Sequence, residues 1–127
     1  MKLDKKGQSM VEMALILPII ILLFLGVFEF SRIFGSYLLI THASREGARL
    51  AAIGRTDAEI QANVEDKVSI LNESELQILL DPEEDDRITG EDVRVRVRYR
   101  LQIYAPVISS IVSNPFEMEA VTYMRVE

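Results

Sequence analysis

The chain has 127 residues and a net charge of −6, and it contains no cysteine. Its length allows one modest domain and one membrane span, and the lack of cysteine excludes disulfides, thiolate chemistry and a lipid anchor on cysteine. Residues 1–28 hold three lysines and two acidic residues, net +1, so residues 29–127 carry −7 of the total. Such an acidic region argues against nucleic acid as a partner, because phosphate binding requires clustered lysine and arginine.

An apolar segment close to the N-terminus predicts a membrane span. Residues 13–28 (MALILPIIILLFLGVF) contain no charged side chain, and the segment reaches 19 residues when it is counted from Met10. A span needs about 20 predominantly apolar residues. The preceding MKLDKK carries three lysines, which favour the cytoplasmic side. We therefore expect a cytoplasmic N-terminus and an extracytoplasmic remainder. No small-residue cleavage site follows the apolar segment, which argues against a cleaved secretory signal.

Glu12 lies inside the start of this apolar segment. A carboxylate at the centre of a span costs about 2.5–3.5 kcal/mol, and less near an interface. Either Glu12 marks the edge of the span, or it has a cationic partner. A cut after Gly7 would give Gln8 a free amine, which is largely cationic at neutral pH. In a bundle of staggered helices, Glu12 of one subunit would then meet the amine of another, which offsets the cost of both charges.

Several motifs follow one another in a fixed order along residues 7–49. Residues 7–14 read GQSMVEMA, Pro18 lies early in the apolar segment, Glu29 and Phe30 end it, and residues 43–49 read ASREGAR. This order resembles the TadE-like family of pilin-like proteins. Lysines followed by Gly7, with Glu12 five residues later, also resemble the processing site of type IV pilins. The resemblance implies cleavage by a prepilin peptidase between Gly7 and Gln8.

The resemblance further implies a minor pilin, or pseudopilin, that is needed to assemble an adhesive pilus of the Tad/Flp type. The expected partners are other pilins, Tad pilus assembly proteins, the prepilin peptidase and inner-membrane lipid, with no small-molecule substrate and no cofactor. Glu12, Arg45, Glu46 and Arg49 are the candidate partner contacts. For the last three, the alternative is that they pair with one another within one helical turn. The alternative function is an unprocessed, membrane-anchored binding or sensor domain.

The expected organisation is a leader over residues 1–7, a transmembrane and stem helix over 8–54, and an extracytoplasmic α+β domain over 55–127. The stem would reach about 70 Å at 1.5 Å per residue, and Gly54 is a plausible stop. Pro18 and Gly47 could kink or interrupt the helix. The alternative is two helices with a break near Gly35.

In the C-terminal part we expect a helix over residues 58–72, capped by Thr56 or Asp57. Strands are expected over 75–80, 93–104 and 116–126, with a polar loop over 81–87. Residues 93–104 alternate apolar side chains with arginine. The arginines are expected to pair with Glu117 and Glu119 on a neighbouring strand. The predicted fold is α+β: a small antiparallel sheet of about three strands with the stem and second helix on one face.

No catalytic constellation is evident. The acidic residues of the 81–87 loop could suggest calcium, but they lack the order of an EF-hand loop, so a solvated loop is expected and no metal site. His42 is the single histidine and has no matching ligand near it. Ser44 and Ser69 have no histidine in a recognisable triad order. We therefore expect no enzyme activity.

Overall fold

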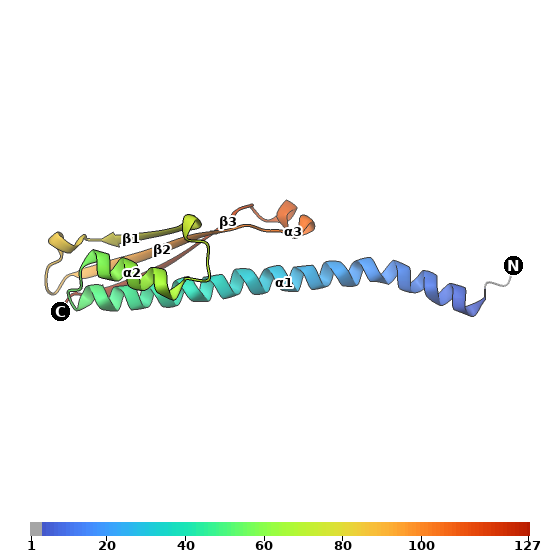
Figure 1. Cartoon of the computed structure of the whole chain (residues 1–127), viewed down its shortest axis with the longest axis horizontal. Coiled ribbons are helices and arrows are strands. Elements are labelled where there is room, and N and C mark those ends of the chain that lie inside the picture. Colours follow the sequence, from blue (N-terminus) through green and yellow to red (C-terminus); the bar gives the residue numbers. More distant parts are fainter. Residues whose placement is uncertain (1–3) are drawn as a thin grey trace.

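The computed structural model describes residues 4–127, and its dominant feature is one long helix. Helix α1 (Lys5–Ala52) runs the length of the molecule, about 72 Å at the usual rise, and the rest of the chain lies along its C-terminal half (Figure 1). The further elements are listed in chain order: α2 (Asp57–Lys67), η1 (Glu73–Glu75), β1 (Leu76–Asp81), η2 (Glu84–Asp86), β2 (Asp92–Leu101), α3 (Pro106–Ile111) and β3 (Phe116–Arg125). The predicted α+β class is confirmed.

Helix α1 is continuous through its proline and its glycines. Pro18 lies inside it, and the alternative of two helices with a break near Gly35 is wrong. Gly47 does not interrupt the helix either. The helix ends at Ala52, two residues before Gly54, whose φ of +78° is readily adopted by glycine. Gly54 therefore acts as the predicted stop.

The three strands form one antiparallel sheet in the order β1-β2-β3. In the register, Val97 of β2 lies between Ile78 of β1 and Ala120 of β3. The odd-numbered residues of β2 are buried and its arginines point to the other face. The predicted pairing of arginine and glutamate is confirmed for three arginines: Arg98 with Glu119 at 2.6 Å, Arg96 with Glu119 at 3.3 Å and Arg100 with Glu117 at 3.0 Å. Arg94 instead forms its ion pair with Asp81 of β1.

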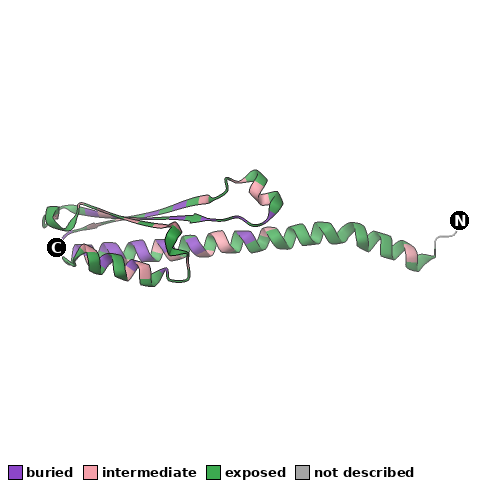
Figure 2. Ribbon diagram, turned by 45° about the horizontal axis from the view of Figure 1, so that its top comes forward, coloured by how far each residue is buried: buried purple, intermediate pink, exposed green. Residues whose placement is uncertain are grey.

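The C-terminal half of α1 and helix α2 cover the apolar face of the sheet. Figure 2 shows that the buried residues are confined to this half of α1 and to the domain. Thr56 caps α2 and forms a capping box with Glu59. Helix α2 ends at Lys67, five residues earlier than expected, and the chain continues in a turn in which the N–H of Leu71 donates to the carbonyl of Val68 at 2.8 Å.

Strand β2 also ends earlier than expected, at Leu101 rather than at residue 104. The backbone groups of the next residues find other partners. Asn114 accepts a hydrogen bond from the N–H of Ile103 at 3.1 Å and donates to its carbonyl at 3.2 Å, as a neighbouring strand would. The N–H groups of Tyr104 and Ala105 donate to a carboxylate on α1. Because these backbone groups are already paired, the ladder stops.

The acidic loop between β1 and β2 is tied to α2. Arg87 forms an ion pair with Asp57 and donates to the carbonyl of Arg55 at 3.0 Å. Glu84 accepts from the N–H of Asp57 at 3.0 Å, and the N–H of Glu84 donates to the Asp57 carboxylate at 3.1 Å. The acidic residues of the loop are exposed, as expected of a solvated loop, and the loop in addition fastens the start of α2 to the sheet.

Candidate functional site

The predicted processing site lies in the first turns of α1. The N–H groups of Gly7 and Gln8 both donate to the carbonyl of Asp4, at 2.8 and 3.2 Å. A Cβ added at Gly7 would meet nothing within 4 Å, so no packing of the folded chain requires glycine here. The first turn of a helix is its least stable part. The Gly7–Gln8 bond is thus at the end of the helix that unwinds most easily. Lys2 of the predicted leader lies outside the described residues.

Glu12 has a partner on its own helix. The side-chain amide of Gln8 donates to its carboxylate at 3.1 Å, four residues earlier, and both side chains are exposed. This contact satisfies one oxygen of the carboxylate without any second subunit. It uses the side chain of Gln8, not the amine that cleavage would create. The two possible partners of Glu12 can therefore be separated by substitution at Gln8.

The first half of α1 exposes its apolar side chains on every side. None of its most apolar 18-residue window is buried in the chain, and the mean hydropathy of that window is 2.7. Leu15, Leu23 and Phe24 are between 63% and 69% exposed. This helix is long and apolar enough to cross a membrane, which indicates single-pass anchoring.

Residues 43–49 (ASREGAR) divide their side chains between two faces of α1. Ala43, Ser44, Gly47 and Ala48 are buried against the domain. A Cβ on Gly47 would lie 2.9 Å from Cγ2 of Val64 and 3.2 Å from Cγ1 of Val95, so glycine lets α1 approach both α2 and β2. The prediction that Gly47 could interrupt the helix missed this packing role.

The charged members of the same run face away from the core. Arg49 donates two hydrogen bonds to the Glu46 carboxylate, at 2.7 and 3.2 Å. The bonded guanidinium of Arg49 holds the pKa of Glu46 below its usual value. Arg45 is exposed and forms no ion pair with any residue in the described part of the chain. Pairing within one turn, one of the two predicted alternatives, therefore accounts for Glu46 and Arg49 but not for Arg45.

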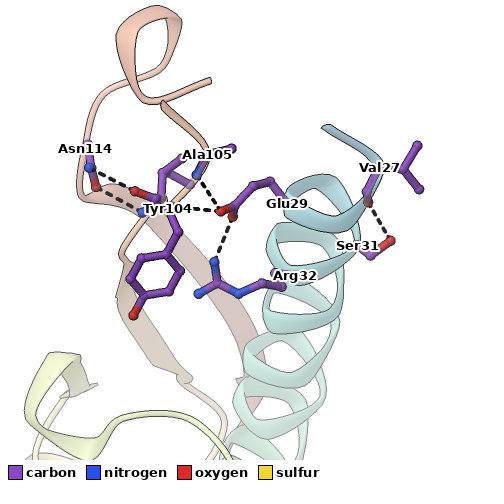
Figure 3. A network of polar contacts seen from close by, with 8 residues as sticks. Val27, Glu29, Ser31, Arg32, Tyr104, Ala105 and Asn114 are labelled. Carbon is purple, nitrogen blue, oxygen red and sulfur yellow. Dashed lines mark hydrogen bonds and ion pairs between the residues drawn. The ribbon is translucent and has the colours of Figure 1, made fainter. Parts of the chain in front are cut away.

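A buried carboxylate joins the end of the apolar segment to the domain. Glu29 is 1% exposed and accepts hydrogen bonds from the N–H of Tyr104 at 2.8 Å and of Ala105 at 3.0 Å (Figure 3). Arg32, one turn later on α1, donates to its other oxygen at 2.8 Å. The Arg32 guanidinium also lies 4.6 Å from the centre of the Tyr104 ring. One side chain thus anchors the β2–α3 connection to the stem.

The sequence interpretation used Glu29 only as part of a motif and did not assign it this role. A local signal was present. Glu29 is the first charged residue after the uncharged run, and Arg32 follows at the spacing of one helical turn. That pattern indicates an ion pair at the edge of the span. It does not reveal the backbone donors, which are 75 and 76 residues away.

The family model described as TadE-like protein matches residues 7–49. This match covers about a third of the chain. The TadE-like segment, residues 7–49, occupies almost all of α1: it contains the apolar stretch, Glu29 and the ASREGAR run, and it ends before the sheet begins. No curated protein and no solved structure matches the chain.

The TadE-like family that this segment matches is a structural, non-enzymatic kind of pilus-associated protein. Ser44 lies in the segment with no exposed surface, and its hydroxyl donates to the carbonyl of Val95 at 2.9 Å and shares a hydrogen bond with Thr122 at 2.9 Å. Its function is therefore to hold α1 to the sheet. His42 is exposed. Among residues 4–127, no group of three or more histidine or acidic side chains is arranged to hold a metal ion.

Proposed function

We propose that the chain is a TadE-like minor pilin that a prepilin peptidase processes and that takes part in assembling a Tad/Flp-type adhesive pilus. The observation that carries the proposal is the coincidence of the TadE-like match with a single continuous helix, in which the uncharged residues 13–28 expose apolar side chains and one acidic residue, Glu12, directly precedes them. A helix that is apolar all round must be covered by lipid or by other helices. A pilin stem is covered by lipid before assembly and by neighbouring stems afterwards.

In this proposal the lysines of MKLDKK stay in the cytoplasm, and the domain over residues 55–127 lies on the other side of the membrane. Processing removes residues 1–7 and leaves Gln8 with a free amine. That amine, on a neighbouring subunit, is the proposed partner of Glu12 in the assembled state, where helix packing excludes water and strengthens the attraction.

The exposed charged face of the ASREGAR run is the proposed docking surface for other pilus components. Arg45 has no ion-pair partner among residues 4–127, while Arg49 and Glu46 hold each other in a fixed geometry. An arginine without an internal partner can form a bidentate pair with a carboxylate of another chain.

The decisive experiment compares two glycines of α1. The full chain is expressed with its prepilin peptidase, extracted from membranes and weighed by mass spectrometry. Wild type should lack residues 1–7, whereas Gly7→Val should keep them, because the peptidase must accept a very small side chain before the cleaved bond.

Gly35→Val is the matched control. Gly35 is also helical and also has nothing within 4 Å of an added Cβ, so both substitutions bring the same change in helix propensity without a clash at Cβ. The control should be processed normally. Recovery of wild-type protein with residues 1–7 intact, from cells that cut a known pilin, would refute processing and favour the membrane-anchored binding or sensor domain.

A further inference from the structure

The connection between β2 and β3 is uncharged and apolar. Residues 101–116 (LQIYAPVISSIVSNPF) hold no Asp, Glu, Lys or Arg, in a chain in which 27% of residues are charged. This connection contains α3, and three of its large side chains face outward. The exposed fractions are 72% for Tyr104, 46% for Val107 and 78% for Ile111. Such a surface on an acidic domain needs a partner that is not water.

The position of α3 along α1 indicates what can cover its exposed apolar side chains. Ile108 of α3 lies 3.9 Å from where a Cβ on Gly26 would be, and Gly26 is inside the uncharged stretch of residues 13–28. Glu29 holds Tyr104 and Ala105 at the same level. In Figure 1, α3 is the part of the domain that reaches farthest towards the N-terminal half of α1.

The length of the apolar segment places this level at the membrane surface. Its 16 uncharged residues span about 24 Å as a helix, and the hydrocarbon core of a bilayer is about 30 Å thick. The whole segment is therefore needed to cross, and Gly26 lies within one turn of the hydrocarbon boundary. Because α3 is fixed beside Gly26, it must lie at that boundary too.

We propose that α3 and its flanking residues enter the membrane interface on the side of the domain, as a second lipid contact beside α1. Tyr104 suits this depth, since its ring is apolar and its hydroxyl can reach water or headgroups. The Glu29–Arg32 pair is neutral as a unit and lies at the same level. The two contacts together hold the domain at a fixed height and in a fixed rotation about the stem.

The side-chain hydroxyls of α3 already have acceptors within the chain, which favours lipid over a polar protein surface. The hydroxyl of Ser109 donates to the carbonyl of Pro106 at 2.9 Å, and that of Ser110 donates to the carbonyl of Val107 at 2.7 Å. In an apolar setting, serine hydroxyls need such internal acceptors. The face that remains is made of valine, isoleucine and tyrosine, and it continues the apolar surface of α1.

The test uses tryptophan as a depth probe, because the chain has none of its own. The full-length chain is reconstituted alone, at low protein density, in vesicles with and without phosphatidylcholine brominated near the headgroup end of its acyl chains. Ile111→Trp reports on α3. Phe24→Trp, inside the span, is the positive control, and Tyr123→Trp, on the exposed face of β3, is the negative control. All three sites are at least 62% exposed, so the substitutions need no repacking.

Ile111→Trp should lose much of its fluorescence in brominated vesicles and emit at shorter wavelength than Tyr123→Trp, which should be unaffected. Quenching of Phe24→Trp but not of Ile111→Trp would overturn the lipid contact and leave the membrane anchor intact. The inference rests on the anchoring part of the proposed function, and failure of Phe24→Trp to be quenched would overturn both. A blue shift of Ile111→Trp that appears only at high protein density, without quenching, would assign α3 to a neighbouring subunit and also overturn the lipid contact.

Discussion

The two halves of α1 have the same backbone and different surroundings. Up to Phe28 the helix carries large aliphatic and aromatic side chains on all sides, and none of the described residues is buried. From Glu29 to Ala52 nine residues are buried, and seven of these are serine, glycine or alanine; the other two are Glu29 and Ile40. Lipid accepts any apolar side chain, so the first half requires only that its side chains be apolar, whatever their size or order. The sheet accepts α1 only at close range, so the second half needs small side chains in one stripe.

The largest effect is expected where the two halves meet. Glu29→Ala removes the acceptor of the Tyr104 and Ala105 N–H groups and leaves Arg32 unpaired. Hydrogen bonds to charged groups are each worth about 1.5–3 kcal/mol when buried, so we expect about 3 kcal/mol of local destabilisation. Amide hydrogen exchange of residues 102–115 in the reconstituted chain measures it.

Glu46→Ala serves as the control for Glu29→Ala. It removes a carboxylate from an i,i+3 ion pair on the same helix, but its partner Arg49 is more than half exposed. Such surface pairs contribute about 0–1 kcal/mol. If exchange over residues 102–115 rises no more in Glu29→Ala than in Glu46→Ala, then Glu29 does not anchor the connection.

The second prediction concerns close approach. Gly47→Ala places a Cβ against Val64 and Val95, whose branched side chains have little freedom in the core. Overpacking of this kind costs about 1–3 kcal/mol. Gly35→Ala meets nothing within 4 Å and should gain about 0.5–1 kcal/mol from helix propensity alone. Exchange of the β2 amides should therefore be faster in the first variant and equal or slower in the second. If both substitutions changed the exchange rate of the β2 amides in the same direction, Gly47 would not be a contact residue.

The third prediction changes the apolar half and should leave the domain untouched. Glu12→Gln is expected to keep membrane abundance normal, because a neutral amide costs less in hydrocarbon, and to reduce co-purification of partner pilins. Gln8→Ala removes the side-chain donor seen at 3.1 Å but keeps the backbone amine. It should retain the partners if the amine is what Glu12 meets. If both variants lost the partner pilins equally, the relevant partner of Glu12 would instead be the side-chain amide of Gln8 on the same helix.

The smallest expected effect is a response of the domain half to acid. The Arg98 guanidinium bonded to Glu119, with Arg96 beside it, lowers the pKa of that carboxyl in the folded chain. A carboxyl with a lowered folded pKa stabilises the fold above its unfolded pKa, and this stability is lost as the pH falls through the folded value. Glu119→Gln should therefore be less stable than wild type at neutral pH, with a difference that shrinks below about pH 4.

Tyrosine near-ultraviolet circular dichroism of the full chain during denaturant titration would follow this difference, because Tyr99 is buried in the domain. Glu83→Gln, an exposed acid without an ion pair in the described part of the chain, is the control. A gap between wild type and Glu119→Gln that stays constant from neutral to acid pH would show that the ion pairs on the open face of the sheet add nothing to stability.

The sequence alone determined the features that depend on neighbours along the chain. The uncharged stretch indicated the span, Thr56 or Asp57 the start of α2, and the alternation of valine with arginine the face of β2 that is buried. The match of arginines to Glu117 and Glu119 followed from that alternation, because an antiparallel neighbour of the same period must present its charges on the same face. These signals repeat every two to four residues and need no knowledge of the fold.

Only the tertiary structure decided what joins the two halves. Glu29 meets backbone groups 75 and 76 residues away, Ser44 a carbonyl 51 residues away, and Gly47 the side chains of α2 and β2. The end of β2 at Leu101 and the position of α3 beside Gly26 were likewise known only from the tertiary structure. In each case the role of the residue cannot be recognised from its neighbours in the sequence. The role depends on an atom that comes close only after the chain has folded. Periodicity predicts which face of an element is buried, but the identity of the atom on the other side depends on how the elements pack.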